Sequence, residues 1–219
     1  SVKLWRDGEN GMTAYASYRN SYKPAVIDFG PEAEGDILKP ETAHSIEGGL
    51  KGEHADGRFE WELSLFQMDF RNLVVTQNVD GLPGLTNAGA EKFKGAELEA
   101  RYAIDGDLSV KGSWTYHDAR FGDYVQLFGD TPRQLRGNLP DLSPQHLGSV
   151  GLLFAPAEGF NASVVANWVG PRFLNKRNTA LAKSYTLVDA GVGYRFDRWE
   201  LRLDGYNLTL TAEPGQTAR

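Results

Sequence analysis

Apolar and polar residues alternate with a period of two along most of this chain. Between positions 59 and 65, Phe, Trp and two Leu residues alternate with Glu60, Glu62 and Ser64. Such alternation predicts a β-strand with one apolar and one polar face. The pattern recurs in the stretches 96–102, 108–115, 150–154, 160–168, 188–196 and 199–204. With the stretches 12–19 and 40–54, the sequence predicts an all-β fold of about nine strands, each roughly ten residues long or more, as membrane-spanning strands are.

Short turns and long polar connections alternate along the chain. The short turns are Ala55-Asp56-Gly57, Asp105-Gly106-Asp107, Pro156-Ala157-Glu158-Gly159 and Asp197-Arg198. The long connections span residues 70–88, 119–143 and 171–184. An up-and-down transmembrane β-barrel has short turns at its periplasmic end and long loops outside the cell. We therefore expect an antiparallel up-and-down segment of a transmembrane β-barrel, with one domain over residues 1–209 and an atypical tail over residues 210–219.

The apolar positions of these strands carry no charge. A charged side chain that faces lipid costs about 2–4 kcal/mol at the bilayer midplane. No Lys, Arg, Asp or Glu occupies the apolar positions of the alternating stretches, which favours a lipid-facing surface. The residues expected to share this convex surface are Phe59, Trp61, Leu98, Ala100, Val110, Leu152, Val164, Val192 and Leu201.

Two of the short turns predict how the strands pair. If Asp197-Arg198 is a two-residue loop, Arg195 lies opposite Glu200 and Phe196 lies opposite Trp199. If Ala103 pairs with Asp107 at the Asp105 turn, Tyr102 lies opposite Leu108 and Glu99 lies opposite Lys111. Both hairpins then gather apolar side chains on one face and pair opposite charges on the other.

The composition argues against a nucleic-acid-binding protein, a disulfide-linked protein and a helical membrane protein. The chain has 219 residues, a formal net charge of −6 and a pI near 5.3, so a nucleic-acid partner is not expected. It has no cysteine, which excludes disulfides and thiolate metal sites. The mean hydropathy is −0.43, and no apolar run approaches the ~20 residues of a membrane helix. Strands with one polar face produce such a low average even when they cross a membrane.

Four short motifs resemble those of a known family. They are Leu38-Lys39-Pro40-Glu41, then Asn87-Ala88-Gly89 with Lys94-Gly95-Ala96-Glu97-Leu98-Glu99, then Leu142-Ser143-Pro144-Gln145-His146, and Asn207-Leu208-Thr209. In this order they resemble the strand and loop signatures of TonB-dependent outer-membrane receptors. The resemblance covers residues 12–209.

The resemblance implies a location and a function. It implies a segment of a 22-stranded barrel, closed by a plug domain, in the outer membrane of a Gram-negative-type bacterium. Such a receptor imports a ferric siderophore or similar metal chelate with energy from the TonB complex, and is not an enzyme. No plug or TonB box precedes residue 12, and residues 210–219 do not read as a final strand. We therefore expect a partial barrel that needs further strands to close.

The long connections hold the candidate ligand contacts. Guanidinium groups and aromatic rings suit anionic chelates, because they offer bidentate hydrogen bonds and stacking. The candidates are Arg71, Tyr124, Arg133, Arg136, Arg172 and Arg177, with Asn72 and Lys176 beside them. No resident cofactor or metal is expected, since the four histidines form no close ligand pair.

Other functions are compatible with the same residues. A haem or cobalamin receptor is one alternative, and His117 or His146, which flank a long connection, would then be the haem ligand. A passive porin-like or adhesin barrel would need neither a plug nor energy coupling. A soluble carbohydrate-binding β domain would also show alternating strands.

Overall fold

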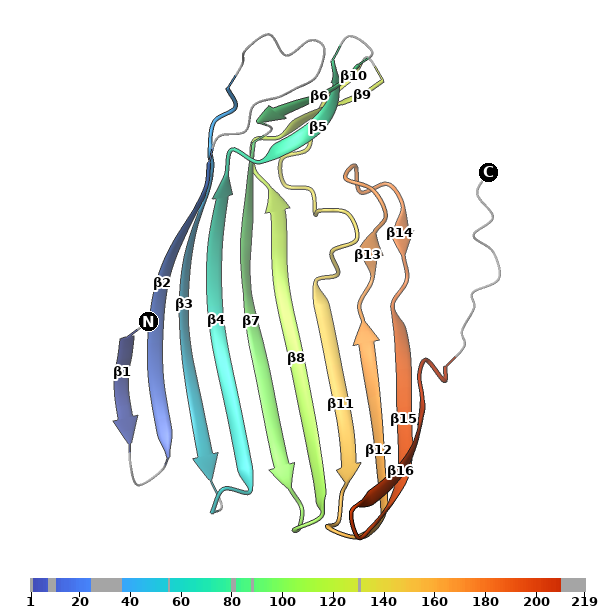
Figure 1. The fold of residues 1–219 in the computed structure, drawn as a ribbon. Coiled ribbons are helices and arrows are strands. Elements are labelled where there is room, and N and C mark those ends of the chain that lie inside the picture. The colour runs from blue at the N-terminus through green and yellow to red at the C-terminus, as the bar shows by residue number, and fades with distance from the viewer. Residues whose placement is uncertain are drawn as a thin grey trace.

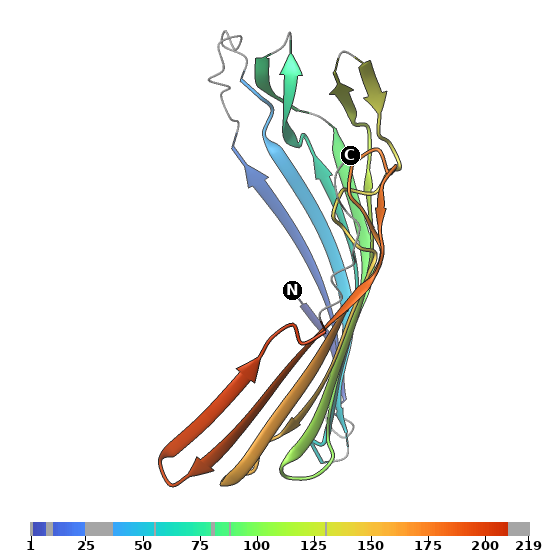
Figure 2. The same ribbon diagram turned by 90° about the vertical axis from the view of Figure 1, so that its right-hand side faces the viewer.

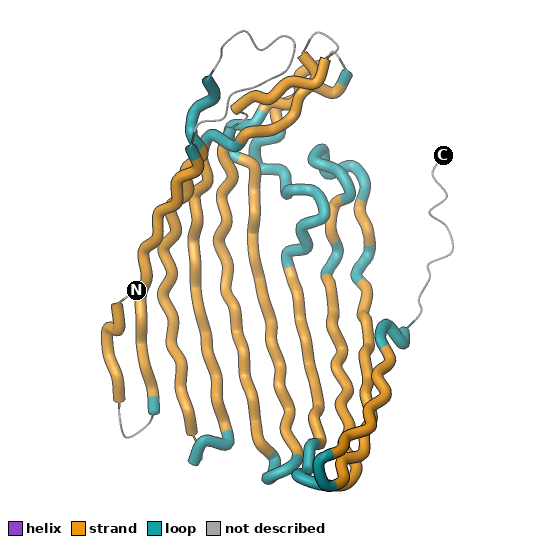
Figure 3. Tube along the Cα trace, viewed as in Figure 1, coloured by secondary structure: helices purple, strands orange, loops and turns teal. Residues whose placement is uncertain are grey.

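The computed structural model describes residues 2–7, 11–24, 37–54, 56–79, 82–87, 89–129 and 131–209. Within these residues every regular element is a β-strand, which confirms the all-β prediction (Figure 3). No helix in this part of the chain has the length and apolar character to cross a membrane. The predicted tail, residues 210–219, and Ala55 of the first short turn lie outside the described residues.

Ten strands form a single antiparallel sheet, and six short strands form three separate hairpins (Figure 1). The strands are β1 (Val2–Asp7), β2 (Met12–Lys23), β3 (Glu41–His54), β4 (Phe59–Arg71), β5 (Val74–Val79), β6 (Leu82–Asn87), β7 (Ala90–Ala103), β8 (Leu108–Phe121), β9 (Val125–Phe128), β10 (Thr131–Gln134), β11 (His146–Phe154), β12 (Gly159–Val169), β13 (Arg172–Phe173), β14 (Leu181–Ala182), β15 (Tyr185–Phe196) and β16 (Trp199–Gly205).

The main sheet is an up-and-down meander. Its strand order is β1-β2-β3-β4-β7-β8-β11-β12-β15-β16, so each strand lies beside its neighbours in sequence once the hairpins are set aside. Figure 1 shows the hairpins β5–β6, β9–β10 and β13–β14 at one end of the sheet and the short turns at the other. The sheet is curved when it is viewed from the side (Figure 2). This asymmetry confirms the predicted division into short turns and long connections.

The sheet has one strand more than the alternation predicts. The extra strand is β1, which pairs with β2 and carries an irregularity between Lys3 and Trp5. An inserted residue shifts the inward and outward positions of a strand by one. The period of two is therefore broken within six residues, which is why the sequence pattern misses this edge strand.

The predicted pairing at the last short turn is confirmed. Arg195 lies opposite Glu200, and Phe196 lies opposite Trp199. The Arg195 Nη2 atom is 3.1 Å from a Glu200 carboxylate oxygen. Asp197 has a φ of 50°, a positive value of the kind that the first residue of a two-residue hairpin loop adopts.

The predicted pairing at the Asp105 turn is wrong by two residues. Tyr102 lies opposite Val110 rather than Leu108, and Lys111 lies opposite Arg101 rather than Glu99. The Asp105 carboxylate accepts hydrogen bonds from the backbone N–H groups of Asp107 (2.9 Å) and Leu108 (2.8 Å), which lengthens the turn. A shift of two residues keeps every side chain on its predicted face.

The pairing places the nine predicted apolar residues on one face of the sheet. Residues directly opposite each other in antiparallel strands share a face, and the chain of pairs runs from Trp61 and Ala100 through Leu152 and Val164 to the last hairpin. We call this the outer face, and we call the opposite face, which carries Glu62, the inner face. Many outer-face side chains are exposed in the isolated sheet, as a surface in contact with lipid would be.

The two faces exchange character near the hairpin end of β4, β7 and β8. We call the short-turn side of the row that joins Leu65, Ala96 and Tyr116 the lower part of these strands, and the hairpin side the upper part. In the lower part the outer face is apolar. Above that row it becomes polar, and the side chains there are Gln67, Asp69, Lys92, Lys94, Asp118 and Arg120. The inner face becomes largely apolar at the same height, where it carries Phe66, Met68, Phe70, Phe93, Ala119 and Phe121 together with His117 and Glu91.

Aromatic rings mark this boundary on the outer face. The ring centroids of Tyr116 and His146 are 5.0 Å apart, and those of Trp114 and His146 are 5.8 Å apart. Gly148 lies opposite Trp114 on one side and Trp168 on the other, so two indoles flank the position that lacks a side chain. Aromatic side chains gather where a barrel meets the interfacial region of a bilayer.

Candidate ligand-binding site

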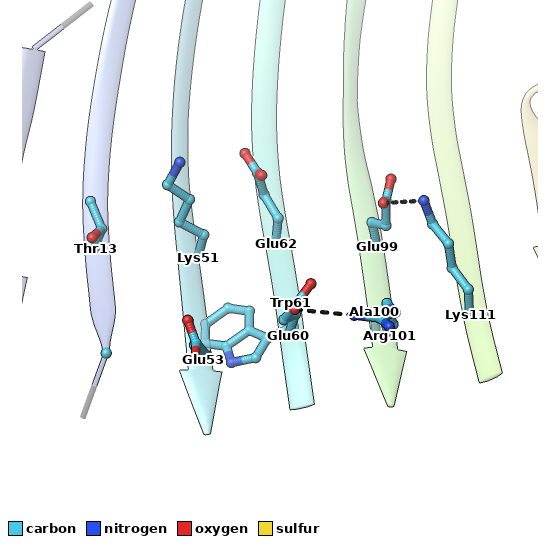
Figure 4. Close-up of a pocket in the computed structure, with 12 residues that line it drawn as sticks. Thr13, Lys51, Glu53, Glu60, Trp61, Glu62, Glu99, Ala100, Arg101 and Lys111 are labelled. Carbon is cyan, nitrogen blue, oxygen red and sulfur yellow. Dashed lines mark hydrogen bonds and ion pairs between the residues drawn. The ribbon is translucent and has the colours of Figure 1, made fainter. Parts of the chain in front are cut away.

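Charged side chains of the inner face pair with one another near the short-turn end. Lys111 Nζ lies 2.6 Å from a Glu99 carboxylate oxygen, and Arg101 lies 3.3 Å from Glu60 (Figure 4). These groups line an open hollow of about 420 Å³. The lining carries four carboxylates and three cations, and two of the cations are ion-paired, so this hollow is not suited to an anionic ligand.

A small apolar core holds the long connections at the opposite end. Phe121 on the inner face of β8 packs against Tyr124 and Leu135, and all three side chains are almost fully buried. Val75 from the β5–β6 hairpin and Phe128 from the β9–β10 hairpin pack against them. The core therefore joins two hairpins to the inner side of the sheet.

An asparagine side chain joins the β8–β11 connection to the β12–β15 connection. Asn178 Oδ1 accepts a hydrogen bond from the backbone N–H of Leu139, and Asn178 Nδ2 donates to the carbonyl of the same residue, both at 2.8 Å. This amide pairs with the N–H and C=O of one residue, as the backbone of a neighbouring antiparallel strand would. Asn178 itself has a φ of 56°, a conformation that Asn tolerates better than most residues.

A second asparagine makes the same kind of contact at the base of the β5–β6 hairpin. Asn87 Oδ1 accepts from the backbone N–H of Lys39 at 2.6 Å, and its Nδ2 donates to the Lys39 carbonyl at 3.0 Å. The Nδ2 group also donates to the carbonyl of Asn72 at 2.8 Å. We call the contacts of Asn87 and Asn178 the asparagine clasps.

Two of the predicted ligand contacts come together in one hollow. Arg133 from β10 and Arg177 from the β12–β15 connection line an open hollow of about 300 Å³, together with Leu135 and Thr179. The Arg177 guanidinium lies 5.0 Å from the centre of the Phe128 ring, which holds it in place from the apolar side. Leu135 connects the hollow to the core on Phe121, so it lies over the inner side of the sheet.

This hollow is suited to a ligand that carries anionic oxygens. Two guanidinium groups supply planar sets of N–H donors. The side chains of Gln134, Asn138 and Thr179 also line the hollow, and each is hydrogen-bonded within the loops. The sequence pattern does not single out Gln134, Asn138 or Thr179. They are ordinary loop residues, and only the contact between two distant connections makes them neighbours of the arginines.

Two other predicted contacts are occupied by partners within the loops. The Tyr124 side chain is 2% exposed, its hydroxyl donates to Gln126 at 3.1 Å, and it accepts from Lys176 at 3.2 Å. Arg136 forms an ion pair with Asp123. The hydrogen bond from Arg136 lowers the pKa of the Asp123 carboxyl and raises the pKa of the guanidinium. Tyr124 and Arg136 therefore hold the loops together, and their polar groups are already occupied.

The last two predicted contacts lie in separate places. The Arg172 guanidinium lies 4.9 Å from the centre of the Tyr185 ring, which is a cation–π distance. Arg71, at the end of β4, lines a different hollow, with Lys39, Asn72, Asn87 and Asp123. The structure thus brings together only Arg133 and Arg177 of the six predicted contacts.

The two histidines considered as haem ligands face opposite sides of the sheet. His146 lies on the outer face, where it packs against the ring of Tyr116. His117 lies on the inner face and makes a 2.9 Å hydrogen bond with the Ser143 hydroxyl. Within the described residues, no group of three or more His, Asp or Glu side chains could hold a metal ion.

The fold and the sequence agree with a known receptor family. Residues 5–208 match the family model described as TonB dependent receptor-like, beta-barrel. The chain belongs to this family. The predicted resemblance is confirmed, and the chain is part of the barrel of an outer-membrane protein of Gram-negative bacteria, so its outer face is the lipid-facing surface.

Several curated relatives are receptors for iron complexes. The chain is 28% identical over 202 residues to the ferrioxamine receptor of Yersinia enterocolitica, covering 92% of this chain and 27% of the relative. It is 27% identical over 219 residues to the ferrichrome outer membrane transporter/phage receptor of Escherichia coli, covering 94% and 27%. The chain thus spans about a quarter of the length of these relatives.

Solved structures show the same fold. The siderophore receptor PiuA from Acinetobacter baumannii superposes with a TM-score of 0.75 at 19% identity, over 93% of this chain and 30% of that one. The ferric yersiniabactin uptake receptor FyuA from Yersinia pestis superposes with a TM-score of 0.72 at 20% identity, over 93% and 30%. The aligned residues therefore make up about 30% of each of these receptor chains.

Proposed function

We propose that this chain forms part of a TonB-dependent receptor that imports a ferric siderophore or a similar metal chelate. Its curated relatives carry names of ferrioxamine, ferrichrome and catecholate siderophore receptors, which supports this cargo class. Energy for import would come from the TonB complex, through a plug domain in the whole receptor. The chain itself supplies barrel wall, inner-face charges and the outer loops.

Within this function, Arg133 and Arg177 are the ligand-contacting residues. The observation that supports this assignment is their meeting in one hollow over the inner side of the sheet. Ferric chelates often present carboxylate, hydroxamate or catecholate oxygens, and guanidinium groups bind such oxygens through paired, charge-assisted hydrogen bonds. Arg136 lies in the same connection but is neutralised by Asp123. It therefore contributes less to an anionic ligand.

The test compares these arginines in the whole receptor that contains this chain. We expect Arg133→Gln or Arg177→Gln to weaken binding of the transported chelate by about 1–3 kcal/mol, since each loses charge-assisted hydrogen bonds. Arg136→Gln is the matched control, with a smaller effect. Binding of ferrioxamine, ferrichrome and a ferric catecholate to purified receptor, measured by quenching of Trp fluorescence, first identifies the chelate.

Uptake by cells separates the proposed cargo from the alternatives. Deletion of the whole receptor gene should abolish growth on one ferric siderophore as the sole iron source and leave growth on haem unchanged. Loss of haem-dependent growth alone would instead indicate haem import, with His117, on the inner face, as the residue to test. Unchanged growth on siderophores, haem and cobalamin would contradict the proposed transport function.

A further inference from the structure

Three cations gather on the outer face of β7 and β8, away from the proposed ligand hollow. Lys92 lies directly opposite Arg120, and Lys94 lies directly opposite Asp118. All four belong to the same face as Leu98, which is lipid-facing. We call Lys92, Lys94 and Arg120 the outer cation cluster.

The outer cation cluster lies immediately above the aromatic boundary. Ala96 of β7 lies opposite Tyr116 of β8, and the next outward pair on these strands is Lys94 with Asp118. Tyr116 is in ring contact with His146, so the cluster begins one pair beyond the aromatic side chains. Aromatic belts lie at the level of the lipid headgroups. The three cations are thus at the height where the phosphates of the outer leaflet lie.

The acidic residues of this surface do not balance its cations. Asp118 is shared, at 2.8 Å from Arg120 and 3.9 Å from Lys94. Asp69 lies opposite Lys92 on its other side, and Arg71 adds a further cation one pair higher on β4. Two carboxylates therefore face four cations, in a chain whose net charge is −6. The local excess is positive.

Lys92 and Arg120 place two positive charges side by side on the outer face. Arg120 is held by Asp118, 2.8 Å from its Nε atom, and its Nη1 atom donates to the Gly137 carbonyl at 2.9 Å. Like charges directly opposite each other in a sheet are destabilising, because their side chains start about 5 Å apart. Both side chains point away from the barrel, Lys92 is exposed, and 48% of the Arg120 side-chain surface is accessible. An anionic group on the membrane side can contact both cations and Lys94 at once. The inner face cannot provide it, because Phe93 and Ala119 occupy that side of the same strands.

We propose that the outer cation cluster binds the phosphate of a lipid headgroup in the outer leaflet of the surrounding membrane. Asp118, whose side chain is 9% exposed, holds Arg120 in position for this contact. Lys92 and Lys94 complete the site from β7. The bound lipid removes the repulsion between Lys92 and Arg120 and fixes the height of the barrel at this point of the wall.

The experiment uses the whole receptor in a nonionic detergent. Lipid A, which carries two phosphates, is titrated while the unfolding temperature is recorded, because a ligand that binds the native state raises it. Phosphatidylcholine, with no net charge, and inorganic phosphate are the comparison ligands. The variant is K92Q/K94Q/R120Q, and the matched control is K51Q/R101Q/K111Q, which removes three inner-face cations. The variant K92Q/K94Q keeps the Arg120–Asp118 pair intact.

We expect lipid A to raise the unfolding temperature of the wild type and of the control at similar concentrations. The apparent affinity should fall about tenfold or more in K92Q/K94Q/R120Q and several-fold in K92Q/K94Q. If the triple variant is destabilised without lipid, the amount of lipid A retained on K92Q/K94Q, measured by native mass spectrometry, gives the comparison. Equal retention by K92Q/K94Q and the control, or an equal response to inorganic phosphate, would overturn the proposal.

Discussion

The lower and upper parts of β4, β7 and β8 are opposite in character, although they belong to the same continuous strands. In the lower part, Leu63 and Leu98 face outward and Glu62 and Glu99 face inward. In the upper part, the outer face is charged and the inner face carries aromatic side chains such as Phe121. No bulge separates the two parts in the pairing of β4 with β7 or of β7 with β8, so the backbone continues unchanged across the boundary.

This difference shows that the surroundings, not the strand, decide which side is apolar. Below the aromatic boundary the outer face meets lipid, and the inner face meets water and other charges. Above it the outer face meets headgroups and water, and the inner face meets folded loops. The height at which the pattern reverses therefore marks the edge of the hydrocarbon. The predictions below test each side of this boundary in the whole receptor.

The largest effect is expected from the apolar core above the boundary. Phe121→Ala should destabilise the packing of the loops by about 3–5 kcal/mol, because it removes a buried ring that contacts Tyr124 and Leu135. Hydrogen exchange should accelerate over residues 122–138. Exchange in the lower part of β8 should not change, and Ser113→Ala on the same face is the control. Faster exchange along the whole of β8 would show that the two parts are not independent.

A charge on the outer face should be costly below the boundary and tolerated above it. Leu63→Lys should destabilise the barrel by about 2–4 kcal/mol, because the ammonium group would face hydrocarbon. Gln67→Lys, two outward positions higher on β4, should cost less than about 1 kcal/mol. Unfolding by urea in lipid vesicles measures both. Equal costs would place the membrane edge elsewhere on this strand.

Loss of an asparagine clasp should loosen two connections without affecting the sheet. Asn178→Ala should cost about 1–3 kcal/mol locally, since the backbone N–H and carbonyl of Leu139 each lose a partner. Limited proteolysis in the connections 122–145 and 170–184 should become faster. Asn175→Ala, which removes a local contact with Thr179, is the control with a smaller change. Unchanged cleavage in Asn178→Ala would exclude the clasp as a link between the connections.

The smallest effect is expected at the short-turn end. Arg195→Gln removes an ion pair with Glu200 in which 38% and 36% of the two side-chain surfaces are accessible. Exposed pairs of this kind contribute about 0.2–1 kcal/mol, and salt screens them. We expect the free energy of unfolding in urea to fall by an amount near the lower limit of this range, and not to fall at 1 M salt. A loss of several kcal/mol would show that the pair is shielded in the complete barrel.

The period of two predicts the lower part of the sheet well, because there each residue contacts either lipid or the barrel interior. It identifies the strands, the outer face and the pairing at Asp197-Arg198. It is wrong at the Asp105 turn, where a side chain of the turn itself bonds to the backbone and lengthens it. It misses β1, whose irregularity breaks the alternation.

The upper part is less predictable from sequence. The guanidinium and aromatic side chains of the connections include Arg133 and Arg177, but also Arg136, which has a partner, and Tyr124, which is buried. Which of them remain available depends on contacts between segments about 40 residues apart, such as Leu139 with Asn178. No local pattern encodes such contacts.

The asparagine clasps separate the position of a loop from its length. Each clasp fixes the backbone N–H and C=O of one residue in a neighbouring segment, so the sheet is continued upward by a side chain rather than by a longer strand. Residues farther out, such as Val75 and Phe128, are attached separately, through the apolar core on Phe121. A connection of another length would keep its position provided that it retained both the amide at its base and these apolar contacts. Aspartate cannot replace the amide, because a carboxylate has no N–H to offer the carbonyl.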